Sequence, residues 1–238
     1  MNWFPVIVAV FALAGPVATR AETLPLPDDL IAFDSKAGEA LLFGAEARND
    51  FFPLSSHFVN QINPAYCGPA SISMVLNALD IPRPPSDMTV GLGLFDQENL
   101  FTPAVDKVKP ASAILSPPYG MTLDDVGAVL AAHDLDVEVV HAGDTDLDAF
   151  RKTAVATLDD DDHFILVNYL RSAIGQEKGG HISPLAAYDA DTDRFLILDV
   201  SQYKYPPAWV EAAALYGAMN TPDSDNGDRT RGYVVVGK

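Results

Sequence analysis

The sequence predicts an α+β fold in which a helical lobe packs against an antiparallel β-sheet lobe. Apolar residues recur at helical spacing mainly in the first half of the chain, whereas short β-branched runs gather in the second half. Two of these runs, 181–190 and 194–200, are joined by a tight turn at 191–193, which is typical of an antiparallel hairpin. The 238 residues contain no internal repeat, so we expect 22–238 to form one domain with two lobes.

The first 21 residues have the pattern of a secretory signal peptide. An apolar run from Phe4 to about Val17 is followed by small residues ending at Ala21, and the run is too short to span a bilayer. No Lys or Arg precedes the run, so an ordinary N-terminal hydrophobic helix is the alternative. We expect cleavage before Glu22, a periplasmic or secreted protein, and no membrane contact after cleavage.

Four segments carry the helical pattern. Ser35 and Thr122 are predicted N-caps of two helices, because each short polar side chain precedes an apolar run of helical period. A central helix begins at Cys67 and stops at a proline-rich stretch, and a further helix is expected within 145–158. The stretch 51–66 has no sustained period and is expected to be a loop. β-Branched residues predict strands at 137–142, 163–170, 181–190, 194–200 and 232–237.

Acidic residues dominate the charge of the chain. The sequence has 33 Asp and Glu against 15 Lys and Arg, a net charge of −18, which repels nucleic acid and anionic membrane surfaces. We therefore expect neither as a partner. Four consecutive aspartates at 159–162 predict a solvated loop, since four neighbours in sequence cannot all face one metal ion. The single cysteine excludes an intrachain disulfide framework.

That cysteine, Cys67, is the candidate nucleophile. It stands at the start of a predicted helix, where backbone amides and the helix dipole lower the pKa of a thiol, and the thiolate is the reactive form. A buried, inert cysteine is the alternative, because free cysteines are among the most buried residues. The nucleophile interpretation therefore needs a base within reach.

His181 is the candidate base and Asp199 the group that orients it. Glycines at 179–180 allow the backbone before His181 to approach other groups closely, and the hairpin register places Asp199 opposite His181 within a residue or two. Gln61, six residues before Cys67, is placed to donate its amide to an oxyanion together with the backbone N–H of Cys67. The other histidines are expected at the surface or in loops: His57, His133, His141 and His163.

Three blocks in this order resemble the catalytic domain of phytochelatin synthases, a papain-like family, and in particular its short bacterial members. The blocks are "QINPAYCGPASISMVLNALDI", the stretch from "NYLR" to "PPAWV", and "AMNTPDS" with "TRGYVVV". The resemblance implies a papain-like fold with the nucleophile on the helical lobe. In that family the cysteine attacks the Cys–Gly bond of glutathione, releases glycine, and holds a γ-glutamylcysteinyl thioester that passes to a second glutathione or to water.

The resemblance also implies roles by position. Cys67 would be the nucleophile, His181 the base, Asp199 its orienting acid and Gln61 the oxyanion donor. Arginine forks match carboxylates, and the residues implied to bind the γ-glutamyl end of the substrate or to line its cleft are Arg171, Arg231, Asp223, Asn168, Tyr66 and Tyr205. For each arginine the alternative is a surface salt bridge.

Two departures from the family pattern favour hydrolysis over chain extension. Eukaryotic members carry an additional cysteine-rich domain linked to heavy-metal sensing, whereas this chain has one cysteine, and Gln202 stands where plant members usually have arginine. Glutathione and its metal thiolates are the implied substrates. No cofactor or metal site is expected, while stimulation by heavy-metal ions or their thiolates and homodimer formation stay open. The alternatives are a bacteriocin-leader-type peptidase and a non-catalytic exported protein that binds metal or thiols.

Overall fold

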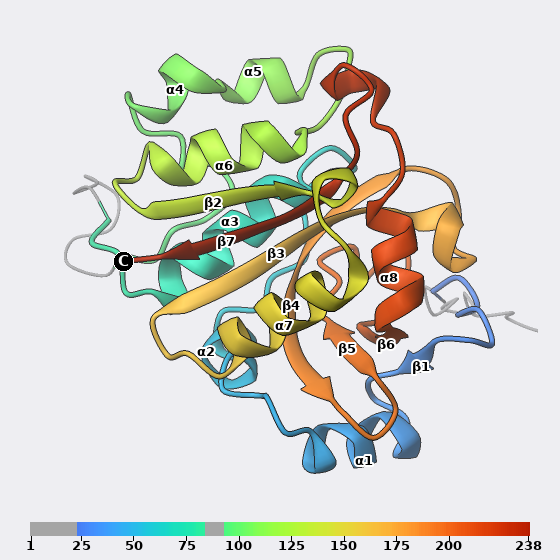
Figure 1. Cartoon of the computed structure of the whole chain (residues 1–238). Helices are drawn as coiled ribbons and strands as arrows, with labels where there is room; N and C mark the ends of the chain where they lie inside the picture. Colours follow the sequence, from blue (N-terminus) through green and yellow to red (C-terminus); the bar gives the residue numbers. More distant parts are fainter. Residues whose placement is uncertain (1–22, 84–92) are drawn as a thin grey trace, which may run out of the picture.

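The computed structural model of the chain describes residues 23–83 and 93–238 (Figure 1). Within these ranges seven strands form one sheet in the order β1-β6-β5-β4-β3-β7-β2, and all neighbouring pairs are antiparallel. The strands are Ile31–Ala32 (β1), Asp136–His141 (β2), His163–Leu170 (β3), Gly180–Asp189 (β4), Arg194–Ile197 (β5), Ala208–Glu211 (β6) and Gly232–Gly237 (β7). The predicted α+β class and antiparallel sheet are confirmed. The predicted signal peptide at 1–21 lies outside the described residues.

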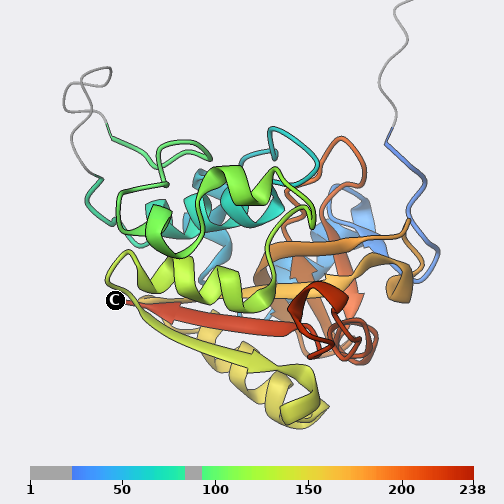
Figure 2. The ribbon, with the colours of Figure 1, turned by 90° about the horizontal axis from the view of Figure 1, so that it is seen from above.

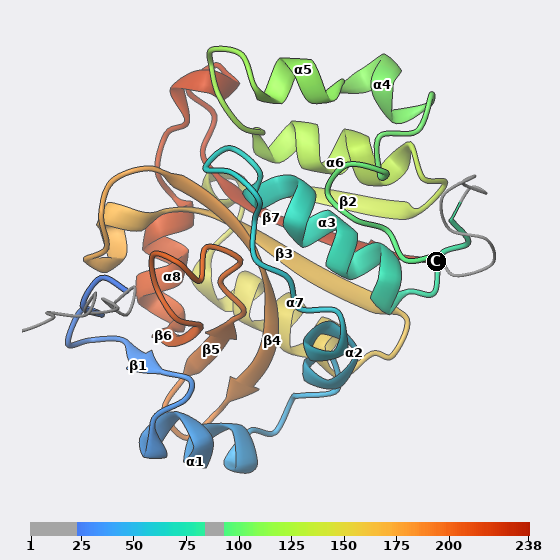
Figure 3. The same ribbon diagram turned by 180° about the vertical axis from the view of Figure 1, so that it is seen from behind.

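Helices cover both faces of the sheet, whereas the sequence pattern predicted a helical lobe on one (Figure 2). Figures 1 and 3 show that α3 and α6 cover one face of the sheet, with α4 and α5 packed outside α6. The other face is covered by α7 and α8. The short helices α1 and α2 lie near the end of the sheet formed by β4 and β5. The helices are Lys36–Gly44 (α1), Phe51–Ser56 (α2), Cys67–Ala78 (α3), Val105–Val108 (α4), Ala111–Ile114 (α5), Leu123–Ala131 (α6), Leu147–Leu158 (α7) and Ala212–Met219 (α8).

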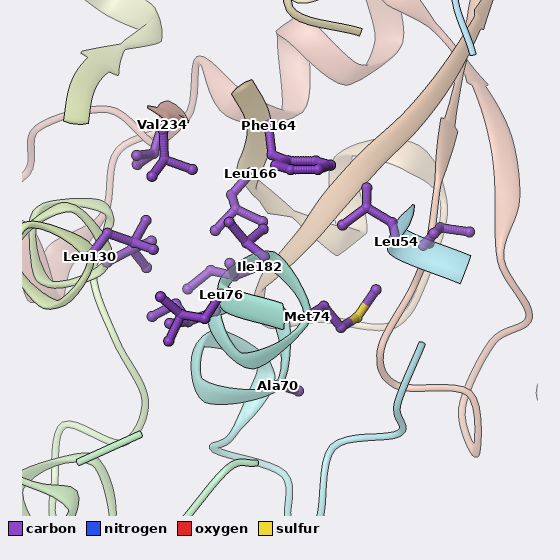
Figure 4. Close-up of a cluster of buried hydrophobic side chains, with 14 of the residues drawn as sticks. Leu54, Ala70, Met74, Leu76, Leu130, Phe164, Leu166, Ile182 and Val234 are labelled. Atoms are coloured by element: carbon purple, nitrogen blue, oxygen red, sulfur yellow. The ribbon is translucent and has the colours of Figure 1, made fainter. Parts of the chain in front are cut away.

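The alternation of side chains along β3 explains why both faces need a cover. Phe164 and Leu166 belong to the hydrophobic cluster that includes α3 and α6, while Ile165 and Val167 belong to the cluster that includes α7 and α8. Figure 4 shows Leu166 next to Ile182 and Leu76, on the side of β3 that faces α3. A strand that is apolar on both faces must be covered on both, because leaving either face in water would forfeit its burial energy.

Capping residues begin the helices where the sequence predicts them. The Ser35 side chain accepts the N–H of Gly38 at 3.0 Å, and Thr122 forms a reciprocal capping box with Asp125. The loop expected at 51–66 is wrong over its first six residues, which form α2. The other helices and strands that the sequence pattern did not predict are β1, β6, α4, α5 and α8.

The β4–β5 hairpin forms with the predicted pairing and a bulge. Asp189 pairs with Arg194 and Leu185 with Ile197, and the register shifts between Leu185 and Ala187. β5 ends at Ile197, before the predicted end at 200. After Ile197 the chain still follows β4, because the N–H of Leu198 donates to the Pro184 carbonyl at 3.1 Å. Among the helices in the described ranges, none is both long and apolar enough to cross a membrane.

Candidate active site

Cys67 is the first residue of α3, and the loop before it fixes its position. The Asn63 side chain accepts the N–H of Ala65 at 2.9 Å, and the Asn63 carbonyl accepts the N–H of Tyr66 at 3.1 Å, which closes a tight turn into the helix. The first turn of a helix leaves its N–H groups without intrahelical acceptors, so negative charge on the thiol is stabilised there. Cys67 keeps 9% exposure and lines a cavity, so it can be reached from one side.

His181 stands beside the start of α3 on β4. The Ser71 hydroxyl of α3 donates to the carbonyl of Ile182 at 3.1 Å, which ties the helix to the strand one residue after His181. The edge-on ring of Tyr169, on β3, has its centroid 5.7 Å from the imidazole. The imidazole of His181 lies next to the thiol of Cys67, close enough to lower the pKa of that thiol. The nucleophile and the base that the sequence predicted are thus in contact.

Asp199 occupies the other side of the imidazole. Nε2 of His181 lies 2.8 Å from Oδ1 of Asp199 and 2.9 Å from Oγ of Ser183. Because Nε2 faces these two oxygens, Nδ1 is the nitrogen left for the thiol. Asp199 is 2% exposed, and its position just after β5 agrees with the predicted register. The structure therefore assembles the predicted nucleophile, base and orienting acid.

Arg171 holds Asp199 and does not line the cavity. Its Nη1 lies 2.8 Å from Oδ2 of Asp199 and its Nη2 donates to Oδ1 at 2.9 Å, a two-point fork. Nη1 also donates to Oε1 of Gln176, and the guanidinium carbon lies 5.4 Å from the ring centroid of Tyr205. The family resemblance suggested a contact with the γ-glutamyl end of the substrate. The structure places the guanidinium of Arg171 against Asp199 and outside the cavity lining, so the substrate contact stays a prediction.

These buried groups shift one another's pKa. Burial raises the pKa of the Cys67 thiol, but His181, the backbone amide of Ile182 and Arg171 together bring it below its ordinary value. Burial lowers the pKa of His181, and Asp199 more than compensates, so the imidazole pKa is raised. Burial likewise opposes ionisation of Asp199, yet His181 and Arg171 hold its pKa well below the usual range. The directions favour a thiolate–imidazolium pair, the reactive state of a cysteine nucleophile.

A cavity of about 960 Å³ opens onto Cys67 and His181. Its wall is built by the loop before α3, the segments between α4 and α5 and between α5 and α6, the first turns of α6, the end of β3, the start of β4, and the segment between α8 and β7. The volume lies at the upper end of the range for small-ligand sites. The predicted site residues that line it are Cys67, His181, Asn168, Asp223 and Arg231.

Arg231 is buried in this wall with one donor unused. Nη1 donates to the Thr221 hydroxyl at 3.1 Å and to the Pro222 carbonyl at 2.5 Å, and Nη2 donates to Oδ1 of Asp223 at 3.2 Å. Among the described residues, its buried Nε–H has no hydrogen-bond partner. Buried donors are nearly always paired, so an acceptor on a bound ligand is the expected partner.

Gln61 lies near the start of α3 and makes its bonds away from the sulfur. Its Nε2 donates to the Asn63 carbonyl at 2.7 Å and to the Tyr203 hydroxyl at 3.3 Å, while its buried Oε1 finds no partner within 23–83 or 93–238. Gln61 is not among the residues that line the cavity. Its role as an oxyanion donor stays a prediction.

Three residues lie in places that differ from the sequence-based expectations. Tyr66 and Tyr205 are buried but do not line the cavity, because the Tyr66 ring packs against Phe101 and Tyr205 packs against Arg171. His141, expected at the surface or in a loop, ends β2 and is 3% exposed. Its Nδ1 contacts the Thr230 carbonyl and its Nε2 lies 2.9 Å from Oδ1 of Asp124, so it braces the cavity wall.

One side of the cavity has no counterpart among the predicted site residues. Lys109, Tyr119, Asp124 and Asp125 line it from the segment around α5 and the start of α6. No motif marks them, and the acids at 124–125 already have a role in the first turn of a helix.

Metal-binding clusters are absent from the described part of the chain. There, no group of three or more His, Cys, Asp or Glu side chains could hold a metal ion. The aspartates at 159–162 are exposed, as expected for a solvated loop. Cys67 is placed as the partner of His181 rather than as one of several ligands around an ion.

A family model described as phytochelatin synthase matches residues 21–233. The chain belongs to the phytochelatin synthase family. It is 34% identical over 218 residues to glutathione gamma-glutamylcysteinyltransferase 3 of Lotus japonicus and 33% identical over 221 residues to glutathione gamma-glutamylcysteinyltransferase 1 of Arabidopsis thaliana. It is 29% identical over 233 residues to the glutathione gamma-glutamylcysteinyltransferase of Schizosaccharomyces pombe.

These three alignments cover 90%, 91% and 96% of this chain but 43%, 43% and 54% of the relatives. The chain therefore spans about half the length of the curated family members it matches. The family resemblance expected from the sequence is confirmed.

Proposed function

We propose that this chain cleaves glutathione at its Cys–Gly bond through a thioester on Cys67. The observation that carries the proposal is the contact of Cys67 with His181, itself held by Asp199, at the wall of a cavity that also contains Arg231. Membership of the phytochelatin synthase family supports glutathione as the substrate. The same membership, with the nucleophile at a helix start, supports a papain-like arrangement of the lobes.

The reaction follows from the proton positions. The Cys67 thiolate attacks the carbonyl carbon of the Cys–Gly amide, and the oxyanion that forms is stabilised by the first free N–H groups of α3. The C–N bond breaks as the imidazolium of His181 gives its proton to the glycine nitrogen, which leaves a thioester and neutral His181. Water then loses a proton to His181 as its oxygen attacks the thioester. The C–S bond breaks, and γ-glutamylcysteine leaves.

Recognition of the substrate begins at the buried arginine. The γ-glutamyl end of glutathione carries a carboxylate and an ammonium, and Arg231 and Asp223 are side by side in the cavity wall with the complementary charges. The unpaired Nε–H of Arg231 would donate to that carboxylate. Asn168, which is buried on β3 and also lines the cavity, would offer a neutral amide to the peptide backbone of the substrate.

We propose hydrolysis as the main outcome, with slow transfer to a second glutathione that yields short phytochelatins. The support is the sequence difference at Gln202, whose plant counterpart is usually arginine. No cofactor is required in this scheme. Export to the periplasm or outside the cell and a homodimer remain proposals, which sequencing of the mature N-terminus and the sedimentation mass would test.

Free glycine measured by mass spectrometry tests the proposed function. Purified protein is incubated with glutathione beside Cys67→Ala, with Ser73→Ala as a matched control, because Ser73 lies on the same buried helix and its hydroxyl bonds within it. We expect a burst of glycine equal to the enzyme, then slow turnover, in the wild type and Ser73→Ala, and none in Cys67→Ala. Equal glycine release by the wild type and by Cys67→Ala would refute the proposal. Cleavage of a double-glycine leader peptide in place of glutathione would refute it as well.

A further inference from the structure

Lys109 is a second cation in the cavity wall that the proposed reaction does not yet employ. Within the described part of the chain, Lys109 and Arg231 are the lining residues that carry a permanent positive charge. Lys109 lies between α4 and α5, on the side of the cavity that the family blocks do not include. A cation facing a substrate cavity is a candidate for binding an anionic group of the ligand.

The ammonium of Lys109 is held in a fixed place. Its Nζ lies 2.8 Å from Oδ2 of Asp125, and the Lys109 side chain is 19% exposed. Asp125 is itself fixed, because its Oδ2 accepts the N–H of Thr122 at 2.9 Å and its own N–H donates to the Thr122 hydroxyl at 3.1 Å. The capping box of α6 therefore anchors this ammonium at the wall. An ammonium has three donors, so one bond to Asp125 leaves others for a ligand.

The charges of the wall make such a cation necessary. Four carboxylates line the cavity in the described ranges: Asp124, Asp125, Asp223 and Asp225. Glutathione has a carboxylate at each end, and each would be repelled by this wall unless it met a cation. Arg231 with Asp223 complements the γ-glutamyl end, where a carboxylate and an ammonium occur together. The glycine end has a carboxylate alone, and the cation left for it is Lys109.

We propose that Lys109 binds the glycine carboxylate of glutathione and selects substrates with a free carboxylate on the leaving-group side. This inference rests on the proposed function. The contact holds the scissile amide between two anchored ends while Cys67 attacks. Once the C–N bond breaks, glycine departs with its carboxylate, and Lys109 loses its ligand before water enters. A product without the glycine therefore binds with no contribution from Lys109.

Binding to an inactive protein tests the inference without turnover. Cys67→Ala and Cys67→Ala with Lys109→Gln are titrated by calorimetry with glutathione and with its glycine ethyl ester, which lacks that charge. We expect Cys67→Ala to prefer glutathione by about 10- to 100-fold, the range for one charge-assisted hydrogen bond, and Lys109→Gln to abolish the preference. Lys107→Gln in the same background is the matched control, because it removes the same charge from an exposed residue of α4 and should leave the preference intact.

The outcomes separate this inference from the proposed function. Equal affinities of Cys67→Ala for the acid and the ester, or an equal loss for both ligands in Lys109→Gln, would overturn the role of Lys109. Lys109→Arg should restore the preference for the acid, which a general unfolding of the segment would not allow. If the preference is found but wild-type protein releases no glycine, the proposed function fails while the carboxylate site stands.

Discussion

Substitution of Arg171 by lysine separates a positioning role from a substrate contact. The arginine makes two charge-assisted bonds to Asp199, at 2.8 and 2.9 Å. Lysine keeps the positive charge but is a single point donor, so at least one of these bonds is lost. Such a bond is worth about 1.5–3 kcal/mol. Because the loss acts on the acid that orients His181, we expect kcat to fall by about 10- to 100-fold with KM little changed.

The kinetic assay follows glycine release over a range of glutathione concentrations. Arg151→Lys is the matched control: Arg151 makes the same fork to Asp193, at 2.8 and 2.9 Å, outside the cavity. We expect the control to keep wild-type kcat and KM. A rise in KM with kcat preserved in Arg171→Lys would refute the positioning role and restore the substrate contact that the family resemblance implied.

A second measurement reads the charge of Arg171 through the only cysteine of the chain. Arg171 contributes to lowering the pKa of both Cys67 and His181. In Arg171→Met both pKa values should therefore rise, and the rate of alkylation of Cys67 by iodoacetamide should reach half-maximum at a higher pH. In Arg171→Lys, which keeps the charge, the shift should be much smaller. Identical alkylation profiles in wild type and Arg171→Met would contradict this coupling.

Charge, burial and backbone packing predict the outcome of four other substitutions. His181→Ala should slow alkylation of Cys67 at neutral pH and move its midpoint to higher pH, because the imidazole lowers the thiol pKa; an unmoved midpoint would argue against the pair. Burial, aided by the aspartates at 159–161, raises the pKa of Asp50 to about 9, so the native state retains a proton that an unfolded aspartate releases near pH 4. The contribution of Asp50 to the free energy of unfolding is therefore complete below about pH 4 and is lost as pH rises toward 9. Asp50→Asn should exceed the wild type in Tm by an amount that grows from about pH 4 to about pH 9. Tm profiles of the two proteins that run parallel over this pH range would refute the prediction. Gly232→Ala should lower Tm by several degrees, because the added Cβ would lie 2.0 Å from a carbonyl oxygen of β2. In the control Gly217→Ala, in α8, the added Cβ meets no atom of the described residues within 4 Å, so Tm should rise slightly. Equal changes in Tm for the two variants would be inconsistent with this packing.

The parts of the fold that were predicted correctly are those with a strong local signal. β3 and β7 begin and end as predicted, because each is a β-branched run bounded by polar or glycine residues. The capped helices after Ser35 and Thr122 begin as predicted for the same local reason. α8 was missed because its exposed positions, Ala213, Ala214 and Gly217, are not polar, so the segment shows no contrast between a polar and an apolar face. β1 was missed because a strand of two residues is too short to show an alternation of polar and apolar side chains.

In the candidate site too, the features that were predicted correctly are those with a local sequence signal. The contact of His181 with Asp199 follows from the register of the hairpin. This register can be predicted from the sequence, because a tight turn fixes which residues of the two strands lie opposite each other. The partner of Arg171 cannot be predicted from the sequence, because a long side chain can reach either the cavity or the buried residues behind it. In the structure, Tyr205 and Gln176 pack around the guanidinium and hold it beside Asp199. Lys109 was missed because it is one lysine in an irregular segment.

The charge of the buried network explains why Arg171 is needed beneath the site. The chain carries a net charge of −18, and a negative field disfavours a thiolate. With Cys67 and Asp199 negative and His181 positive, the three residues alone would leave one uncompensated negative charge in the interior, which is costly. Arg171 brings the sum of the four groups to zero and lowers the pKa of the thiol. A cation bound so firmly to Asp199 is not available to the substrate. If glutathione is the substrate, as proposed, its recruitment must depend on cations that line the cavity, so substitutions at Arg231 should change affinity, whereas substitutions at Arg171 should change the reactivity of the sulfur.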